Sequence, residues 1–539
     1  MGDFKSDEGP SDPFGIGSYN LENITFDLLK RSVSSRKAAG LYKLDTLIET
    51  VVYLICACSV WSFGAVDDSS ELFLSVCMAF TACLLAFRHS LARKHGVETR
   101  WDANGGSAYF WAVRLLIVTN ILLLLYVLLH WINYRAEFDL SSLTFEYREG
   151  FLVWLPHSYD RTGTAAEFWR MLAMSAWFWA LRDWLLTIDR GDLRSDGFGA
   201  KMSVRLNRLV VFLCMNAIAV GIVGILQRLG TNETLLWLRV PLFPNPDSHF
   251  GPFAYRGNAC SYFNLVWPLF GLMLLARVGT SGKRRARVGG DPRIALFPGL
   301  VMLIGIPFFS ASRAGSIVAF LCIALSLVLL RRFVVRKNLL SIVLVSIIAF
   351  VIAFLGVGDL LLRINMSLSS NYAVRGLDRI LIYENAYSML REYSPWGSGP
   401  GSFASMYHMY RSPRIADNRN NRLEPWNAWV HSDPLEYLVT YGFLGTVLLL
   451  VCLLLVFFIP VLVNGWRVVG TLLGFVYISG LGFCVHSIVD FPFQVFGLAC
   501  NFVVVMAIAS AAGFSPVLVG DREGQERRFE HRDRFRRQA

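Results

Sequence analysis

The chain has 539 residues, of which 54% are apolar and 17% charged, with a mean hydropathy of +0.46 and a formal net charge of +11. An ordinary soluble core cannot hide that much apolar surface, so the composition excludes a soluble globular protein and indicates a protein of the lipid bilayer. The positive charge does not call for a nucleic-acid partner, because the basic residues gather in short loops between apolar segments and in a C-terminal tail.

Apolar segments recur along the whole chain in stretches of roughly 17 to 25 residues, the length that crosses a bilayer as a helix. A membrane barrel would instead show short segments of alternating polarity. The pattern predicts an all-α polytopic membrane protein with about twelve transmembrane helices and a large, partly helical extracytoplasmic loop. We expect the helices near residues 46–65, 71–87, 108–132, 167–188, 209–229, 259–275, 294–309, 316–330, 339–356, 435–463, 468–485 and 493–512.

Short loops rich in Lys and Arg fall on one side of the membrane when the crossings are counted. They cover residues 88–100, 190–208, 283–293 and 331–337. The positive-inside rule makes that side cytoplasmic, together with both termini. No apolar segment followed by a small-residue cleavage site occurs in the polar start of the chain, so we expect no cleaved signal peptide. The expected organisation is a cytoplasmic segment (1–44), N-terminal transmembrane helices (45–229), a transmembrane core (230–512) and a basic cytoplasmic tail (513–539) that can meet anionic lipid.

The core contains an unusually long connection on the opposite face, residues 357–434. It is rich in aromatic residues and has an apolar stripe at helical spacing, made by Ile380, Tyr383, Tyr387 and Leu390, so we expect interfacial helices rather than disorder. On this topology, a cysteine placed at Ser405 is expected to react with a thiol reagent that does not cross the membrane.

The same loop holds eight arginines and no lysine. A guanidinium offers a planar fork of donors that grips phosphate through two hydrogen bonds, so this bias indicates an anionic, phosphate-bearing ligand. Pairing with neighbouring carboxylates or with lipid headgroups is the alternative for each of them.

Two further arginines, Arg256 and Arg313, stand where apolar segments meet the same face. A guanidinium beside hydrocarbon needs a partner, which indicates a functional role, although snorkelling to the interface would also explain the position. Ala311, Ser312 and Gly315 are small enough to let a helix or ligand approach Arg313 closely.

Three titratable residues near the end of the chain complete the candidate site. His431 follows the long loop directly before an apolar segment, where a neutral imidazole could take a proton from a hydroxyl; a purely structural histidine is the alternative. His486 and Asp490 are spaced to share one helix face, and they could either support the site or merely end that helix before Pro492.

Five short motifs follow one another along the second half of the chain. They are Tyr255-Arg256 followed by Pro268-Leu269, Ser312-Arg313-Ala314-Gly315, Arg379 with the segment 394–403, His431 followed by Leu435, Tyr441-Gly442 and Gly445, and the segment 486–492. In this order they resemble the O-antigen ligase and O-antigen polymerase superfamily of bacterial envelope enzymes. The resemblance covers roughly residues 230–512, and the earlier helices match only in kind.

The resemblance implies transfer of a glycan from undecaprenyl diphosphate to an acceptor hydroxyl of a lipid, glycan or protein. It implies an inverting, metal-independent reaction without a cofactor, on the periplasmic face of the bacterial inner membrane. His431 would then act on the acceptor hydroxyl, and Arg256, Arg313 and Arg379 would bind the donor diphosphate, which agrees with the chemistry of a leaving group that gains negative charge. His486 and Asp490 would be possible supporting residues.

A transporter or flippase for an anionic lipid-linked substrate is the rival interpretation, since it would share the helices and the arginines. Transporters usually carry titratable residues near the bilayer midplane and an internal repeat. Glu49, Arg182 and Asp183 are among the few such candidates, and no repeat is evident. The sequence does not separate a ligase from a polymerase, since these differ only in the acceptor.

Overall fold

A computed structural model of the chain describes residues 36–95, 107–187, 203–230, 234–241, 248–278, 292–310, 312–334, 370–410, 429–464 and 470–512. The long helices are α2 (Arg36–Trp61), α3 (Asp68–His95), α4 (Ser107–Ile132), α5 (Arg161–Leu185), α7 (Val204–Leu229), α8 (Arg256–Val278), α9 (Pro292–Phe309), α10 (Arg313–Val334), α12 (Ser370–Tyr393), α15 (Asp433–Asn464), α16 (Gly470–Ser487) and α17 (Phe496–Ala512). A shorter helix, α13 (Phe403–Tyr410), and an antiparallel hairpin of β1 (Ala136–Asp139) and β2 (Thr144–Tyr147) complete the described elements.

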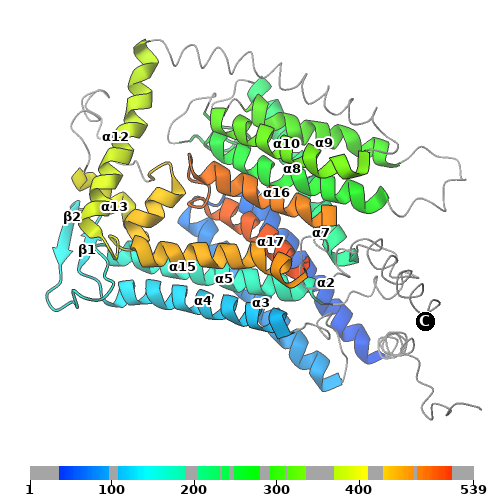
Figure 1. Cartoon of the computed structure of the whole chain (residues 1–539), viewed down its shortest axis with the longest axis horizontal. Helices are drawn as coiled ribbons and strands as arrows, with labels where there is room; N and C mark the ends of the chain where they lie inside the picture. Colours follow the sequence, from blue (N-terminus) through cyan, green and yellow to red (C-terminus); the bar gives the residue numbers. More distant parts are fainter. Residues whose placement is uncertain are drawn as a thin grey trace, which may run out of the picture.

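Most of the long helices run side by side, while α12, α13 and the hairpin lie together at one end of the bundle, at the left of Figure 1. We call this end the site end. The turns after α2 and before α17 also meet, since the Gly497 N–H donates to the Gly64 carbonyl at 2.9 Å. Helix α16 packs on α8, α15 on α4, and both α3 and α17 on α5. The hydrophobic core is therefore shared by helices far apart in the sequence.

The fold is that of a helical membrane protein. Within the described residues, five helices are long and apolar enough to cross a bilayer: 40–61, 68–94, 111–132, 204–229 and 433–458. Four shorter apolar helices accompany them, at 298–309, 313–329, 473–487 and 496–511. The predicted count of about twelve spans is not confirmed by these helices, and the span expected at 339–356 lies outside the described residues. Helix α2 begins at Arg36, so its first turns precede the expected boundary at residue 45.

Ion pairs join the helices at the end opposite the site, where the basic loops were expected. Arg88 donates to Asp45 at 2.6 Å, and Arg208 grips both carboxylate oxygens of Glu49 at 2.6 and 2.7 Å. Because Arg88 and Asp45 are buried, each would be costly without the other. These contacts give Glu49 a structural partner within the bundle.

The glycine-rich segment 394–403 fastens the long loop to a break in α15. At Gly442 the backbone has φ 65° and ψ −171°, a conformation that is essentially restricted to glycine. The loop occupies the break, because the Ser398 N–H donates to the Val439 carbonyl at 2.9 Å and the Phe443 N–H donates to the Pro395 carbonyl at 3.0 Å. This motif therefore positions the loop against a membrane helix.

Two expectations about the loop need correction. In α12 the buried residues include Ile382, Ala386 and Met389. Of the predicted apolar stripe, Tyr383 and Leu390 pack against this cluster, whereas Ile380 and Tyr387 are exposed. Ser405 is also buried, and its hydroxyl donates to Asp160 Oδ2 at 2.7 Å, so it is unsuited to labelling.

Candidate active site

His431 stands at the site end, two residues before α15, in a backbone conformation that is uncommon for residues other than glycine. Its φ is +61°, in the left-handed region that side chains with a Cβ rarely adopt. Such backbone strain persists only where the surroundings impose it, and it gathers at functional sites. The Tyr383 hydroxyl of α12 donates to the His431 carbonyl at 3.1 Å and helps hold this conformation.

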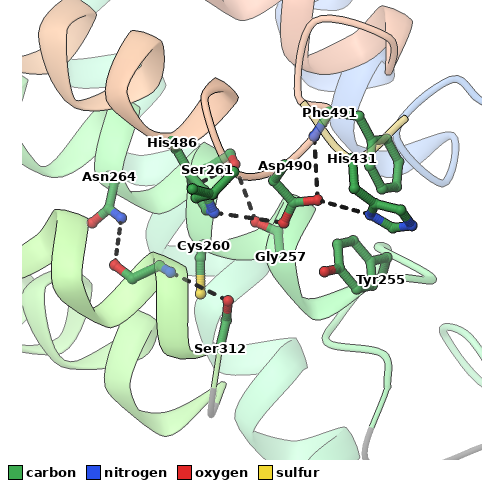
Figure 2. A network of polar contacts seen from close by, with 12 residues as sticks. Tyr255, Gly257, Cys260, Ser261, Asn264, Ser312, His431, His486, Asp490 and Phe491 are labelled. Atoms are coloured by element: carbon green, nitrogen blue, oxygen red, sulfur yellow. Dashed lines mark hydrogen bonds and ion pairs between the residues drawn. The ribbon is translucent and has the colours of Figure 1, made fainter. Parts of the chain in front are cut away.

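A buried carboxylate lies between the two candidate histidines (Figure 2). Asp490 Oδ1 is 3.6 Å from His431 Nδ1, and Asp490 Oδ2 is 3.7 Å from His486 Nε2. These distances lie in the range of ion pairs and just beyond that of direct hydrogen bonds. The Asp490 side chain is only 3% exposed, whereas that of His431 is 24% exposed. His431 is therefore partly open to solvent, and Asp490 lies buried behind it.

The second histidine is fixed by α8. Its Nδ1 is 2.8 Å from the hydroxyl of Ser261, which also donates to the Gly257 carbonyl at 3.1 Å. His486 is fully buried, so it has no direct route to a large substrate. His486 therefore contacts Asp490 from the buried side of the site.

Aromatic rings form one wall of the site. Trp429 stacks on Phe491 at 4.6 Å between ring centroids, and Phe491 stacks on Tyr255 at 5.5 Å. The edge of the His431 ring meets Phe491 at 4.8 Å. The rings thus pack against the imidazole, whose Nδ1 lies on the side of Asp490.

Arg379 reaches this wall from α12. It donates to the Tyr255 hydroxyl at 3.2 Å and to the Val489 carbonyl at 3.3 Å. Burial raises the pKa of Tyr255 above its usual range, with Asp490 adding to the rise and Arg379 and Arg256 opposing it. The phenol therefore stays protonated, and its O–H can donate a hydrogen bond to an anionic ligand.

Arg256 and Arg313 begin two neighbouring helices. Arg256 is the first residue of α8, next to Tyr255, and its N–H donates to the Ser248 carbonyl at 2.7 Å. Arg313 is the first residue of α10 and its side chain is exposed. A Cβ added at Gly315 would lie 2.3 Å from Cys260 Cβ, so α10 starts directly against the second turn of α8. The starts of α8 and α10, the residues before α15 and the end of α16 thus carry candidate residues at the site end, where α12 adds Arg379.

The sequence motifs did not reveal every residue of this arrangement. The structure brings His431, His486 and Arg379 together around Asp490 and Tyr255, with Arg256 beside them. Arg313 lies at the start of the neighbouring helix α10. The roles of Ser261 and Phe491 were missed. Ser261 lies 225 residues before its partner His486, and no local signal links the two.

Gly257 provides a test of the packing around Asp490. A Cβ at this position would lie 2.4 Å from Asp490 Oδ2 and 2.4 Å from the Tyr255 ring, so Gly257→Ala must displace one of them. We expect strongly reduced activity and a loss of about 1–3 kcal/mol of stability, as for other overpacked sites. Gly40→Ala is the matched control, since nothing lies within 4 Å of its added Cβ. Thermal melting and activity of both variants would check this, and a Gly257→Ala protein that behaves like Gly40→Ala would refute the packing.

The fold and this site define a helical membrane protein with a histidine, a buried carboxylate and several arginines at one end of its bundle. Residues 298–450 match the family model described as O-antigen ligase. The match over these residues supports the resemblance to the O-antigen ligase superfamily that was drawn from the motifs. No curated protein matches the chain.

The matched region contains some of the candidate residues. Arg313, Arg379 and His431 lie within residues 298–450, whereas Arg256, His486 and Asp490 lie outside them. The family match supports, in general terms, membrane glycosyl transfer of the O-antigen ligase or polymerase type. Members of this family act on lipid-linked glycans and acceptors.

Proposed function

We propose that the chain transfers a glycan from undecaprenyl diphosphate to an acceptor hydroxyl, at the periplasmic face of the bacterial inner membrane. The observation that carries this proposal is the placement of His431 Nδ1 3.6 Å from the buried carboxylate of Asp490. The carboxylate favours the tautomer with a proton on Nδ1, and this leaves Nε2 free to accept a proton. Figure 2 draws that second nitrogen on the side of the ring away from Asp490.

The proposed step is a single displacement. His431 Nε2 accepts the proton of the acceptor hydroxyl while its oxygen forms a bond to the anomeric carbon of the donor glycan. The bond from that carbon to the diphosphate oxygen breaks, and undecaprenyl diphosphate leaves with the electron pair. Attack from the face opposite the leaving group inverts the anomeric centre. The proton passes to His431 and the electron pair to the diphosphate, so the proposed step needs neither a cofactor nor a metal ion.

The arginines supply charge for the leaving group. Negative charge grows on the diphosphate oxygens as the bond breaks, and guanidinium groups stabilise that charge best in a poorly hydrated place. We assign this role to Arg256, Arg313 and Arg379. The Tyr255 O–H, which accepts a hydrogen bond from Arg379, is a further donor toward the same phosphates.

Asp490→Asn tests the orienting role of the carboxylate. Asparagine has nearly the same shape and keeps an oxygen for the Phe491 N–H, but it lacks the negative charge. We expect transfer to slow by about 10²-fold or more, while donor binding persists. Glu146→Gln on the exposed hairpin is the control. Unchanged transfer in a stably folded Asp490→Asn protein would remove the carboxylate from the proposal.

The membrane orientation can be tested by cysteine labelling. Met409 of α13 is 51% exposed at the site end, whereas Arg93 of α3 is exposed at the opposite end. In intact spheroplasts, an impermeant thiol reagent should label Met409→Cys and should reach Arg93→Cys only after permeabilisation. The reverse pattern would overturn the periplasmic orientation.

A further inference from the structure

A tight turn after the β-hairpin carries apolar side chains where polar ones are usual. The Leu155 N–H donates to the Leu152 carbonyl at 3.1 Å, which closes the turn over Val153 and Trp154. Val153 is 67% exposed and Trp154 is 71% exposed. Turn tips that face water generally carry Gly, Pro, Asn, Asp or Ser. The exposed side chains of Val153 and Trp154 are therefore better suited to an apolar environment than to water.

Hydrogen bonds hold the turn beside the end of a membrane helix. Asn133 Nδ2 donates to the Leu152 carbonyl at 2.9 Å, and the Leu152 N–H donates back to Asn133 Oδ1 at 2.8 Å. Asn133 directly follows Ile132, which ends α4 and the candidate span 111–132 and is 63% exposed. The apolar turn thus continues the lipid-facing surface of α4.

The aromatic and basic residues around the turn are of the types that are common at the boundary between lipid and water. Trp131 packs against Trp169, which is 57% exposed, at the adjoining ends of α4 and α5. The guanidinium groups of Arg148 and Arg161 each lie 4.8 Å from the ring centroid of Tyr134. Trp and Tyr concentrate at the headgroup level of membranes, where basic residues meet lipid phosphates.

We propose that the turn 152–155 inserts into the bilayer leaflet at the site end, with phospholipid as its partner. Leu152, Val153 and Trp154 enter the boundary of the acyl chains, and Arg148 and Arg161 face the headgroup phosphates. The bilayer is favoured over another protein because the turn is bonded to the end of a lipid-facing helix and continues its surface.

This insertion would fix the depth of the long loop. The Tyr159 N–H, four residues after the turn, donates to the Ser398 carbonyl at 2.9 Å, and the Thr164 hydroxyl donates to the Pro400 carbonyl at 2.7 Å. These bonds connect the turn to the glycine-rich segment that is fastened to α15. Insertion of the turn would thereby fix the position of the site end relative to the bilayer surface.

Spin labelling tests the proposal in the full chain. A nitroxide is placed at Val153→Cys, with Trp154→Cys as a second position and Ser142→Cys on the exposed hairpin turn as the matched control, each in a Cys83→Ala background because Cys83 is exposed. The protein is reconstituted in phospholipid vesicles at low protein density. We measure collision of each label with oxygen, which partitions into lipid, and with a nickel chelate, which stays in water.

The expected result is several-fold more collision with oxygen than with the nickel chelate at 153 and 154, and the reverse at 142. Nickel-dominated collision at 153 and 154, equal to that at 142, would overturn the proposal. Shielding of 153 and 154 from both reagents would also overturn it, because it would mean that protein, such as a second copy of the chain, covers the turn.

Discussion

His431→Asn should abolish glycan transfer while leaving the fold and donor binding intact. Asparagine tolerates the left-handed backbone at this position better than most residues, so the substitution does not add strain to the φ of +61°. Its amide cannot accept a proton, and the loss of a general base lowers the rate by about 10²–10⁴-fold.

The measurement separates the two functions of the site. Transfer and binding of a purified lipid-linked glycan would be followed in parent and variant, together with the melting temperature. Loss of transfer and binding together, with a lowered melting temperature, would favour a structural histidine. Transfer at the parental rate would remove His431 from the reaction.

Arg256→Lys and Arg313→Lys should each slow transfer by about 10- to 100-fold, because losing one charge-assisted hydrogen bond costs about 1.5–3 kcal/mol. Lysine keeps the positive charge but lacks the planar fork that grips a diphosphate through two parallel bonds. The loss should therefore appear even though the net charge of the protein is unchanged.

Arg93→Lys is the matched control for these variants, since Arg93 is exposed at the opposite end of the bundle. Rates and donor affinity would be measured for all three proteins. Parental rates in both site variants would show that the donor diphosphate is bound elsewhere.

Much of the fold could be predicted because lipid imposes a simple rule on the sequence. A helix such as α4, with six leucines in its second half, satisfies its own backbone and can face lipid, so its length and composition identify it. The helices expected at 294–309 and 468–485 are also present, as α9 and α16, although these shorter helices are partly covered by other helices. The stripe on α12 was misread because its buried face depends on the loop packed beneath it.

The residue types of the candidate site could also be predicted, but not their pairing. His431 and the arginines were conspicuous as polar groups beside apolar segments. The i,i+4 spacing of His486 and Asp490 already indicated that these two residues lie close together. The contact between Asp490 and His431 instead depends on how the residues before α15 pack against the end of α16, which the local sequence does not encode. The bond from Arg379 to Tyr255 joins residues 124 positions apart and was likewise inaccessible.

The most direct test of the proposed reaction is product formation by the purified chain in proteoliposomes that contain lipid-linked donor, acceptor and a metal chelator. We predict that the acceptor gains the glycan through a new glycosidic bond of inverted configuration, with one undecaprenyl diphosphate released for each bond formed. Movement of intact donor between leaflets without any new glycosidic bond would contradict the account and would support a transporter instead.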